Sequence, residues 1–304
     1  MYRNLNPTAL GMTGRQSELI ELALTYGFSS LDVDMDAIVK RARASGLEQA
    51  RRFISSANIR GGEFSLPVNL TASDATYRSN LAELDEFAQV AASLHSAACR
   101  ATISPVCPAG VPYQEAFELH RTRLAETADV LAGHDIRLGL AFLAAPGYRA
   151  QAESPFIHDP DTLMTLIRTI GNPNVGLALD TWDWFVGGGS LDDLFVIPAE
   201  GIISVRLADI PEAADLASIA DDERYLPGDG GRVDCRAIVQ HLMTTGYTGP
   251  VTLYPAAVRL AGMTRDAIVH RAKKTLDELF SPGPSTPARM EQVEAPAGAD
   301  AVSE

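Results

Sequence analysis

The sequence has no long hydrophobic run and little cysteine. No apolar stretch among its 304 residues approaches the roughly 18 consecutive residues that a membrane-spanning helix requires. Residues Met1–Pro7 contain no continuous apolar segment, so we expect no secretory signal. The three cysteines, Cys99, Cys107 and Cys235, form no Cys-x-x-Cys pair. Because such a sparse and odd set is typical of a reduced compartment, the sequence predicts a cytoplasmic protein.

Basic residues are in deficit. Lys and Arg number 25 against 39 Asp and Glu, which gives a formal net charge of −14. Nucleic-acid affinity depends largely on Lys and Arg contacts with phosphates. Anionic lipid headgroups also repel an acidic protein. We therefore expect neither nucleic acids nor membrane surfaces as partners.

What the sequence does contain is a regular alternation of short apolar runs and longer amphipathic stretches. Runs such as Val175–Leu179 are apolar at successive positions, as in parallel strands covered by helices on both faces. Candidate strands lie near residues 8–12, 29–35, 61–68, 99–104, 136–143, 175–180, 201–207 and 250–254, and helices are expected at 17–26, 74–94, 113–131, 161–170, 233–245 and 264–279.

Eight strands separated by helices predict an α/β fold, the (β/α)8 TIM barrel, which typically needs roughly 250 residues. Residues 1–280 have that size and are expected to form one domain. The alternative, a doubly wound open sheet, is disfavoured because no Gly-x-Gly-x-x-Gly follows the first strand. Residues 281–304 form a Pro-, Ala- and Glu-rich tail with little to bury, and we expect it to be disordered.

The active site of a TIM barrel is built from the C-terminal ends of its strands and the loops that follow them. Asp32 follows the second candidate strand, Asp180 and Asp183 follow the sixth, Arg206 lies on the seventh and Tyr254 ends the eighth. Charges inside apolar strand ends are costly unless they are paired or used. Asp180 and Arg206 are therefore candidate functional residues, or else a buried pair that closes the barrel mouth.

Six segments follow one another in a recognisable order along the chain: Tyr26–Asp32, Gly139–Leu143, Leu179–Trp184, Val205–Asp209, Asp222–Gly230 and Gly249–Pro255. Together they resemble the xylose isomerase-like sugar phosphate isomerase/epimerase superfamily, which is related to the AP endonucleases of family 2. The resemblance extends over about residues 8–280 and implies a TIM barrel that isomerises or epimerises a sugar next to its carbonyl.

The resemblance also implies a divalent metal, held by Glu, Asp, His and Glu on strands five to eight. Carried over by position, Ala141 stands in place of the first glutamate and Asp180 matches the aspartate. Arg206 replaces the histidine and Tyr254 replaces the last glutamate, while Asp183 stands where another histidine is usual. A divalent cation needs several oxygen or nitrogen ligands, and arginine supplies none. We therefore expect no metal cofactor.

The polar residues at these strand ends have expected roles that differ from the family's metal-assisted chemistry, and Arg224 matches a sugar- or phosphate-binding arginine of the family. Asp180 and Asp183, neutralised by Arg206 and Arg224, include the candidate base. Arg206 is a candidate for stabilising an oxyanion, and Tyr254 for donating a hydrogen bond or a proton. The expected substrate-binding residues are Trp182, Arg224 and Asp32. In the competing interpretation, Trp182 simply packs inward.

Gly228–Gly231 allows two interpretations. Its backbone N–H groups could face an anion, although a glycine-rich turn is more often only a turn.

The function expected from the sequence is that of a sugar phosphate isomerase/epimerase-like protein with an absent or altered activity, since three of the four metal-ligand positions are replaced. Its partner would be a small-molecule sugar or polyol, and the sequence is compatible with a homo-oligomer. The alternative is a pseudoenzyme that binds a carbohydrate or serves as an interaction surface. An AP endonuclease role ranks third, because it would need several metal ions and a basic DNA-binding face.

Overall fold

The computed structural model describes residues 1–281, apart from the side chain of Phe53. The predicted tail therefore lies outside the described residues, except for Ser281. Within 1–281, no helix combines the length and the apolar character that crossing a bilayer requires.

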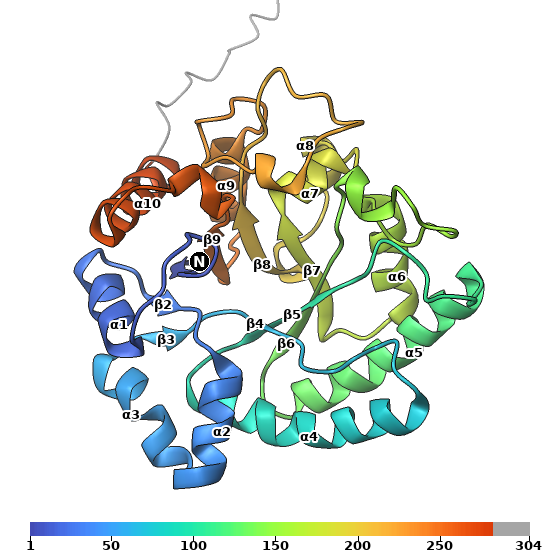
Figure 1. Ribbon diagram of the computed structural model, residues 1–304, viewed down its shortest axis with the longest axis horizontal. Coiled ribbons are helices and arrows are strands. Elements are labelled where there is room, and N and C mark those ends of the chain that lie inside the picture. The colour runs from blue at the N-terminus through green and yellow to red at the C-terminus, as the bar shows by residue number, and fades with distance from the viewer. Residues whose placement is uncertain (282–304) are drawn as a thin grey trace, which may run out of the picture.

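Nine short parallel strands surround a common axis in the order β3-β2-β1-β9-β8-β7-β6-β5-β4 (Figure 1). The first and last in this order, β3 and β4, are separated along the chain only by Gly62 and Glu63. One stretch of chain thus pairs with β2 on one side and β5 on the other, which closes an eight-stranded barrel if β3 and β4 count as one. The predicted TIM barrel is confirmed. The strands are β1 (Tyr2–Leu5), β2 (Ser30–Leu31), β3 (Arg60–Gly61), β4 (Phe64–Ser65), β5 (Ala98–Thr102), β6 (Arg137–Ala141), β7 (Val175–Asp180), β8 (Ile202–Leu207) and β9 (Pro250–Leu253).

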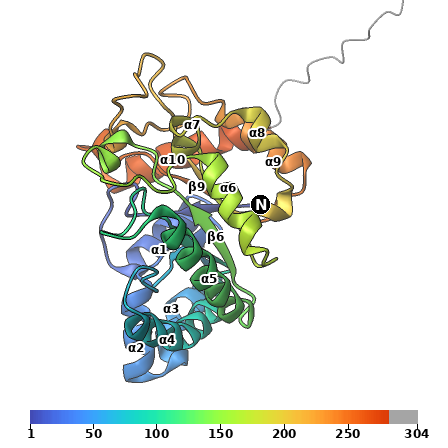
Figure 2. The ribbon, with the colours of Figure 1, turned by 90° about the vertical axis from the view of Figure 1, so that its right-hand side faces the viewer.

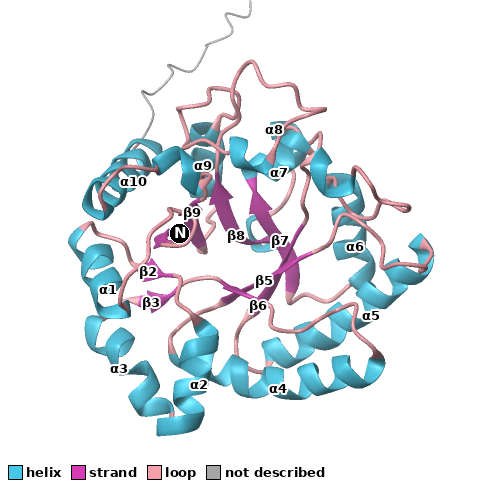
Figure 3. Cartoon of the chain, in the orientation of Figure 1, coloured by secondary structure: helices cyan, strands magenta, loops and turns pink. Residues whose placement is uncertain are grey.

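Helices cover the outer surface of the barrel (Figure 3). Several begin at side-chain caps: the side chains of Ser73, Asp159, Asp234 and Thr264 each accept a hydrogen bond from a backbone N–H in the first turn. The helices are α1 (Gln16–Thr25), α2 (Met35–Ser45), α3 (Leu47–Ala57), α4 (Asp74–Ser93), α5 (Tyr113–Ala132), α6 (Pro160–Ile170), α7 (Thr181–Val186), α8 (Leu191–Phe195), α9 (Cys235–Thr244) and α10 (Arg265–Phe280), with short 3-10 turns at Pro146–Arg149, Ala199–Gly201, Asp221–Glu223 and Ala257–Leu260.

The predicted first strand at 8–12 is wrong, because the strand that enters the sheet is β1. The chain forms a turn after Asn6 instead, in which the N–H of Met12 donates to the carbonyl oxygen of Pro7 over 2.8 Å. Leu10 and Met12 are buried, so their apolar character reflects a loop packed on the core. The sequence pattern also fails to predict α2, α3, α7 and α8, and it makes the second and third strands too long.

The central strands bury both of their faces. Every residue of β7 is buried, as is all of β8 except the half-buried Arg206. Since the strands are parallel, their C-terminal ends open at one end of the barrel, where long loops follow β5, β6 and β8. Figure 2 shows the loop between β8 and α9, residues 208–234, beside α7. This loop and the neighbouring strand ends carry most of the predicted site residues.

Candidate functional site

The strand register brings the predicted residues to adjacent strand ends. Asp180 pairs in register with Arg206, and Arg206 pairs with Thr252 of β9. Tyr254 lies two residues beyond Thr252, on the same face of the chain, and its ring lies 4.1 Å below the Arg206 guanidinium. Asp180 and Arg206 are neighbours, yet their ion pairs are made with other residues.

Arg224 reaches back from the loop after β8 and joins the two aspartates of the β7 end. Its Nη1 lies 2.8 Å from Oδ1 of Asp180, and its Nη2 lies 2.8 Å from Oδ2 of Asp183. The Asp221 carboxylate is a third partner at 2.9 Å. Arg224, Asp180 and Asp183 are all buried. The predicted pairing of the two aspartates with Arg224 is therefore present, whereas Arg206 forms its ion pair with Glu63.

The electrostatics of this cluster follow from its burial. Burial raises the pKa of Asp183 to about 6, with Asp180 adding to the shift and Arg224 opposing it. Burial lowers the pKa of Arg224, but Asp180 and Asp183 more than offset this and raise it well above its ordinary value. Asp180 also caps α7, because its Oδ1 accepts the N–H groups of Trp182 and Asp183. The cluster holds the loop after β8 against the β7 end.

Trp182 is completely buried, and Arg224 covers its ring at 4.4 Å. Its indole N–H donates to the carbonyl oxygen of Glu223 over 3.1 Å. The ring thus packs against the guanidinium and the loop, and its predicted contact with a substrate stays a prediction.

A second charged cluster lies inside the barrel, centred on Glu63, a residue that the sequence analysis missed. Oε1 of Glu63 accepts from Nε of Arg100 at 2.8 Å and from Nη2 of Arg206 at 2.6 Å. The Ser204 hydroxyl donates to its other oxygen. Burial alone would raise the pKa of Glu63, but Arg100 and Arg206 outweigh it and lower the pKa to about 2. The sequence signal that could have identified Glu63 is its position as the single acidic residue inside the candidate strand 61–68.

Asp32 stands at the end of β2 and is half-buried. Its Oδ1 accepts from the amide of Asn4 at 2.8 Å, and its Oδ2 accepts from the amide of Asn6 at 2.7 Å. Burial and the nearby Glu63 raise the pKa of Asp32 to about 7, although Asn4 and Arg206 oppose the shift. Asp32, Arg206 and Tyr254 are thus half-buried groups at the barrel mouth, and all three were predicted from the sequence.

The glycine-rich segment Gly228–Gly231 does face an anion, and that anion is the protein's own Asp209. Asp209 is fully buried, and its two oxygens accept six backbone N–H groups over 2.7–3.2 Å. The donors are Ile210, Gly228, Gly230, Gly231, Arg232 and Val233. The carboxylate fixes the loop that carries Arg224.

We expect the substitution Asp209→Ala to lower the free energy of unfolding by about 2 kcal/mol, because the loop N–H groups lose their acceptor and regain water only in part. Urea denaturation measures the change. The control is Glu212→Ala, which removes an exposed carboxylate from the same loop and should change stability by less than about 0.5 kcal/mol. Equal effects of the two substitutions would contradict the anchoring role of Asp209.

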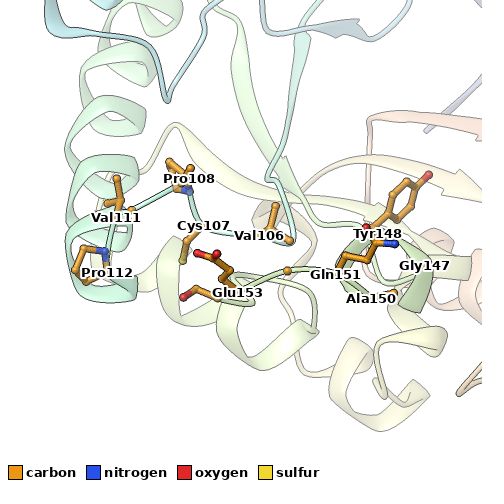
Figure 4. Close-up of a pocket in the computed structure, with 14 residues that line it drawn as sticks. Val106, Cys107, Pro108, Val111, Pro112, Gly147, Tyr148, Ala150, Gln151 and Glu153 are labelled. Carbon is orange, nitrogen blue, oxygen red and sulfur yellow. The ribbon is translucent and has the colours of Figure 1, made fainter.

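A cavity of about 820 Å³ lies beside these clusters, between the loops after β5 and β6 (Figure 4). Its lining is mostly small and apolar, from residues 106–112, 147–148 and 150–154, and contains none of the predicted site residues. Tyr148 stands at the end opposite Val111 and Pro112 (Figure 4). Burial and the Asp221 carboxylate raise the pKa of Tyr148 to about 12. Tyr148 is therefore the side chain that links this cavity to the Arg224 cluster.

The positions assigned to metal ligands carry few donors. Ala141 is buried at the end of β6 and its methyl group offers none. Arg206 carries only N–H donors, and Tyr254 offers a single phenolic oxygen. Among residues 1–281, no three or more His, Cys, Asp or Glu side chains gather in a group that could hold a metal ion.

Comparison with known proteins gives consistent results. The model of the xylose isomerase-like TIM barrel family matches residues 20–276. A xylose isomerase domain protein from Alicyclobacillus acidocaldarius superposes with a TM-score of 0.82 at 25% identity, covering 92% of this chain and 98% of that one. Inosose isomerase from Bacillus subtilis is 22% identical over 158 residues, which are 52% of this chain and 54% of that protein. The 3-dehydroshikimate dehydratase of Pseudomonas aeruginosa is 27% identical over 161 residues, 46% of this chain and 25% of that protein. The chain thus matches about half of the isomerase and a quarter of the dehydratase.

Proposed function

Since the chain belongs to the xylose isomerase-like TIM barrel family, we propose that it binds a sugar, sugar phosphate or polyol at the barrel mouth without a divalent metal. The observation that carries this proposal is the pairing of the Arg224 guanidinium with both Asp180 and Asp183. The positively charged Arg224 guanidinium thus pairs with the residues at two positions that the resemblance assigns to the metal site.

The donor set does not fit a divalent ion. Asp180 is the one expected ligand retained, and a metal would have to displace Arg224 to reach it. Arg206, on the next strand, would add repulsion in a buried setting where charges are weakly screened. Ala141 contributes no donor atom. No step of the proposed chemistry therefore passes through a metal.

Three half-buried groups remain for a ligand: Asp32, Arg206 and Tyr254. The carboxylate of Asp32 accepts hydrogen bonds from ligand hydroxyls, while Arg206 donates to a carbonyl or phosphate oxygen. Glu63 and the Tyr254 ring hold the Arg206 guanidinium in place. If a proton leaves the carbon beside the carbonyl, the same guanidinium stabilises the resulting oxyanion. In this proposal Asp180 and Asp183 position Arg224, and Tyr254 donates a hydrogen bond.

The second candidate function is non-catalytic binding of a carbohydrate. It is favoured by the burial of Asp180, Asp183 and Trp182, whose side chains are already occupied by Arg224 and the loop after β8. Binding without turnover of the ligand distinguishes this candidate from the first.

Metal analysis combined with thermal unfolding tests the proposal. We expect far less than one Mn²⁺, Mg²⁺ or Zn²⁺ per chain, and no change in the unfolding temperature on addition of EDTA. Among the probes inosose, 3-dehydroshikimate, D-fructose and fructose 6-phosphate, a ligand at 100 times its Kd should add about 2.7 kcal/mol to stability.

Two variants locate the binding. Arg206→Ala should abolish the ligand-induced stabilisation, and Tyr254→Phe, which keeps the ring next to Arg206, should weaken it. Glu212→Ala should respond as the wild type does, because its side chain is exposed in the loop after β8. One tightly held metal ion per chain, or an unchanged response of Arg206→Ala, would refute the proposal.

A further inference from the structure

The carboxylates near the barrel mouth differ in their partners. Glu63 is paired with two guanidinium groups, and Asp180 and Asp183 share a third. Asp209 is surrounded by backbone N–H groups. Among the described residues, Asp32 is the one of these five carboxylates that has no ion pair and is not surrounded by backbone N–H groups; side-chain amides are its main partners. A half-buried carboxylate that forms no ion pair is available for a proton.

The position of Asp32 is nevertheless well defined. Its Oδ1 accepts an amide N–H from Asn4 and its Oδ2 accepts one from Asn6, while the backbone N–H of Glu63 is a further donor to the carboxylate. Asn4 is itself buried, and two further hydrogen bonds fix its side chain: its amide also donates to Thr252, and its carbonyl oxygen accepts from the Ser30 hydroxyl at 2.7 Å. The carboxylate is thus held in one orientation by uncharged groups, which leaves its protonation free to change.

Gly62 makes room for this arrangement. A Cβ at that position would lie 2.0 Å from Oδ1 of Asp32 and 2.3 Å from Oδ1 of Asn4, closer than any real contact. The backbone between β3 and β4 therefore approaches the carboxylate as only glycine permits.

The charged and titratable neighbours of Asp32 come from three sides of the barrel. Glu63 and Arg206 act on it with opposite signs, and Tyr2 of β1 also lies within its electrostatic reach. Burial and Glu63 outweigh Arg206, so the pKa of Asp32 rises to about 7. Both protonation states are then populated at neutral pH, which suits a group that both takes and returns a proton.

We propose that Asp32 is the residue that moves a proton between adjacent carbons of the ligand, with Asn4 and Asn6 as positioning residues; this rests on the proposed function. The Asp32 carboxylate removes a proton from the ligand carbon next to the carbonyl. The C–H electrons form a carbon–carbon double bond, and the carbonyl oxygen becomes an oxyanion facing Arg206. The Asp32 carboxylic acid then returns the proton to the former carbonyl carbon, while the proton of the ligand's adjacent hydroxyl moves to the former carbonyl oxygen. No redox partner is needed.

Hydrogen exchange with solvent tests this assignment. The wild-type protein is incubated in D₂O with inosose, 3-dehydroshikimate or D-fructose, and NMR measures deuterium at the carbon beside the carbonyl. We expect Asp32→Asn to slow this exchange at least 100-fold while it still binds the probe in the thermal assay. The control is Asp34→Asn, which changes an exposed carboxylate two residues away to another good cap for α2 and should exchange like the wild type.

Two pH measurements separate chemistry from structure. The wild-type exchange rate should rise through a pH near 7, and Asn6→Ala should move that rise to higher pH, because the carboxylate loses a hydrogen bond that favours its charged form. In addition, raising the pH from 4 to 7 should lower the unfolding temperature less in Asp32→Asn than in Asp34→Asn. A carboxyl whose pKa is raised in the folded state binds its proton more tightly there, so the folded state loses stability as the pH rises and the proton leaves.

The outcomes are distinct. Exchange by Asp32→Asn at the wild-type rate would overturn the assignment. Binding of a probe by the wild type without any exchange would also overturn it, but would leave the proposed binding function standing. Absence of both binding and exchange would overturn the proposed function and the assignment with it. Loss of exchange with retained binding, confined to the Asp32 variant, would support it.

Discussion

The substitution Glu63→Ala is expected to lower the free energy of unfolding by about 3–5 kcal/mol, the cost of leaving a buried charge without its partner. The Glu63 side chain is 3% exposed and lies between Arg100, which is equally buried, and Arg206. Removing the carboxylate leaves two guanidinium groups facing each other inside the barrel. Urea denaturation at pH 7 measures the loss.

The control for Glu63→Ala is Glu118→Ala, which removes an exposed partner of Arg121 on α5 and should cost less than about 0.5 kcal/mol. The pH dependence provides a second check. The folded-state pKa of Glu63 is lowered from 4.5 to about 2, so its stabilising contribution is present above pH 4.5 and is lost as the pH falls through 2. The variant should lack this acid-dependent decline. A loss of less than about 1 kcal/mol at pH 7 would contradict the buried pairing.

The substitution Arg224→Ala is expected to lower the free energy of unfolding by about 3–4 kcal/mol at pH 7.5 and by clearly less at pH 5. Without the guanidinium, Asp180 and Asp183 are two buried carboxylates with like charges. The pKa of Asp183 is already raised to about 6 with Arg224 in place, and the loss of Arg224 raises the pKa of Asp183 further. At pH 5 the carboxyl is protonated, which removes the repulsion. Urea denaturation at the two pH values measures both losses.

Arg224→Lys is the matched control for this prediction. Lysine keeps the positive charge, but its single ammonium group cannot bridge Asp180, Asp183 and Asp221 as the guanidinium does, so an intermediate loss is expected. If Arg224→Ala lost the same stability at both pH values, the coupling between Arg224 and Asp183 would be refuted.

Much of the fold could be predicted because parallel barrel strands leave a local pattern. Segments such as Val175–Asp180 and Ile202–Leu207 are apolar at successive positions because helices and the barrel interior bury both faces. Strand β1 has no such pattern, since its polar Asn4 faces the interior to hold Asp32 and Thr252. The apolar residues just after it were therefore mistaken for the strand.

The sequence by itself determined the barrel and the strand ends that carry Asp32, Asp180, Arg206 and Tyr254. That the chain binds no divalent metal stays a prediction. It also predicted that Arg206 and Arg224 neutralise Asp180 and Asp183, and of these two only Arg224 forms ion pairs with the aspartates.

Only the tertiary structure decided which polar groups meet inside the barrel. Glu63 and Arg206 are separated by 143 residues, and Asn4 and Thr252 by 248. No local pattern encodes such pairs, because they form only when the sheet assembles: β1 then lies beside β9, and the chain between β3 and β4 comes within hydrogen-bond distance of β8. The same closure pairs Arg206 with Glu63 instead of with its neighbour Asp180, and it leaves Asp32 without an ion pair among the five carboxylates compared above.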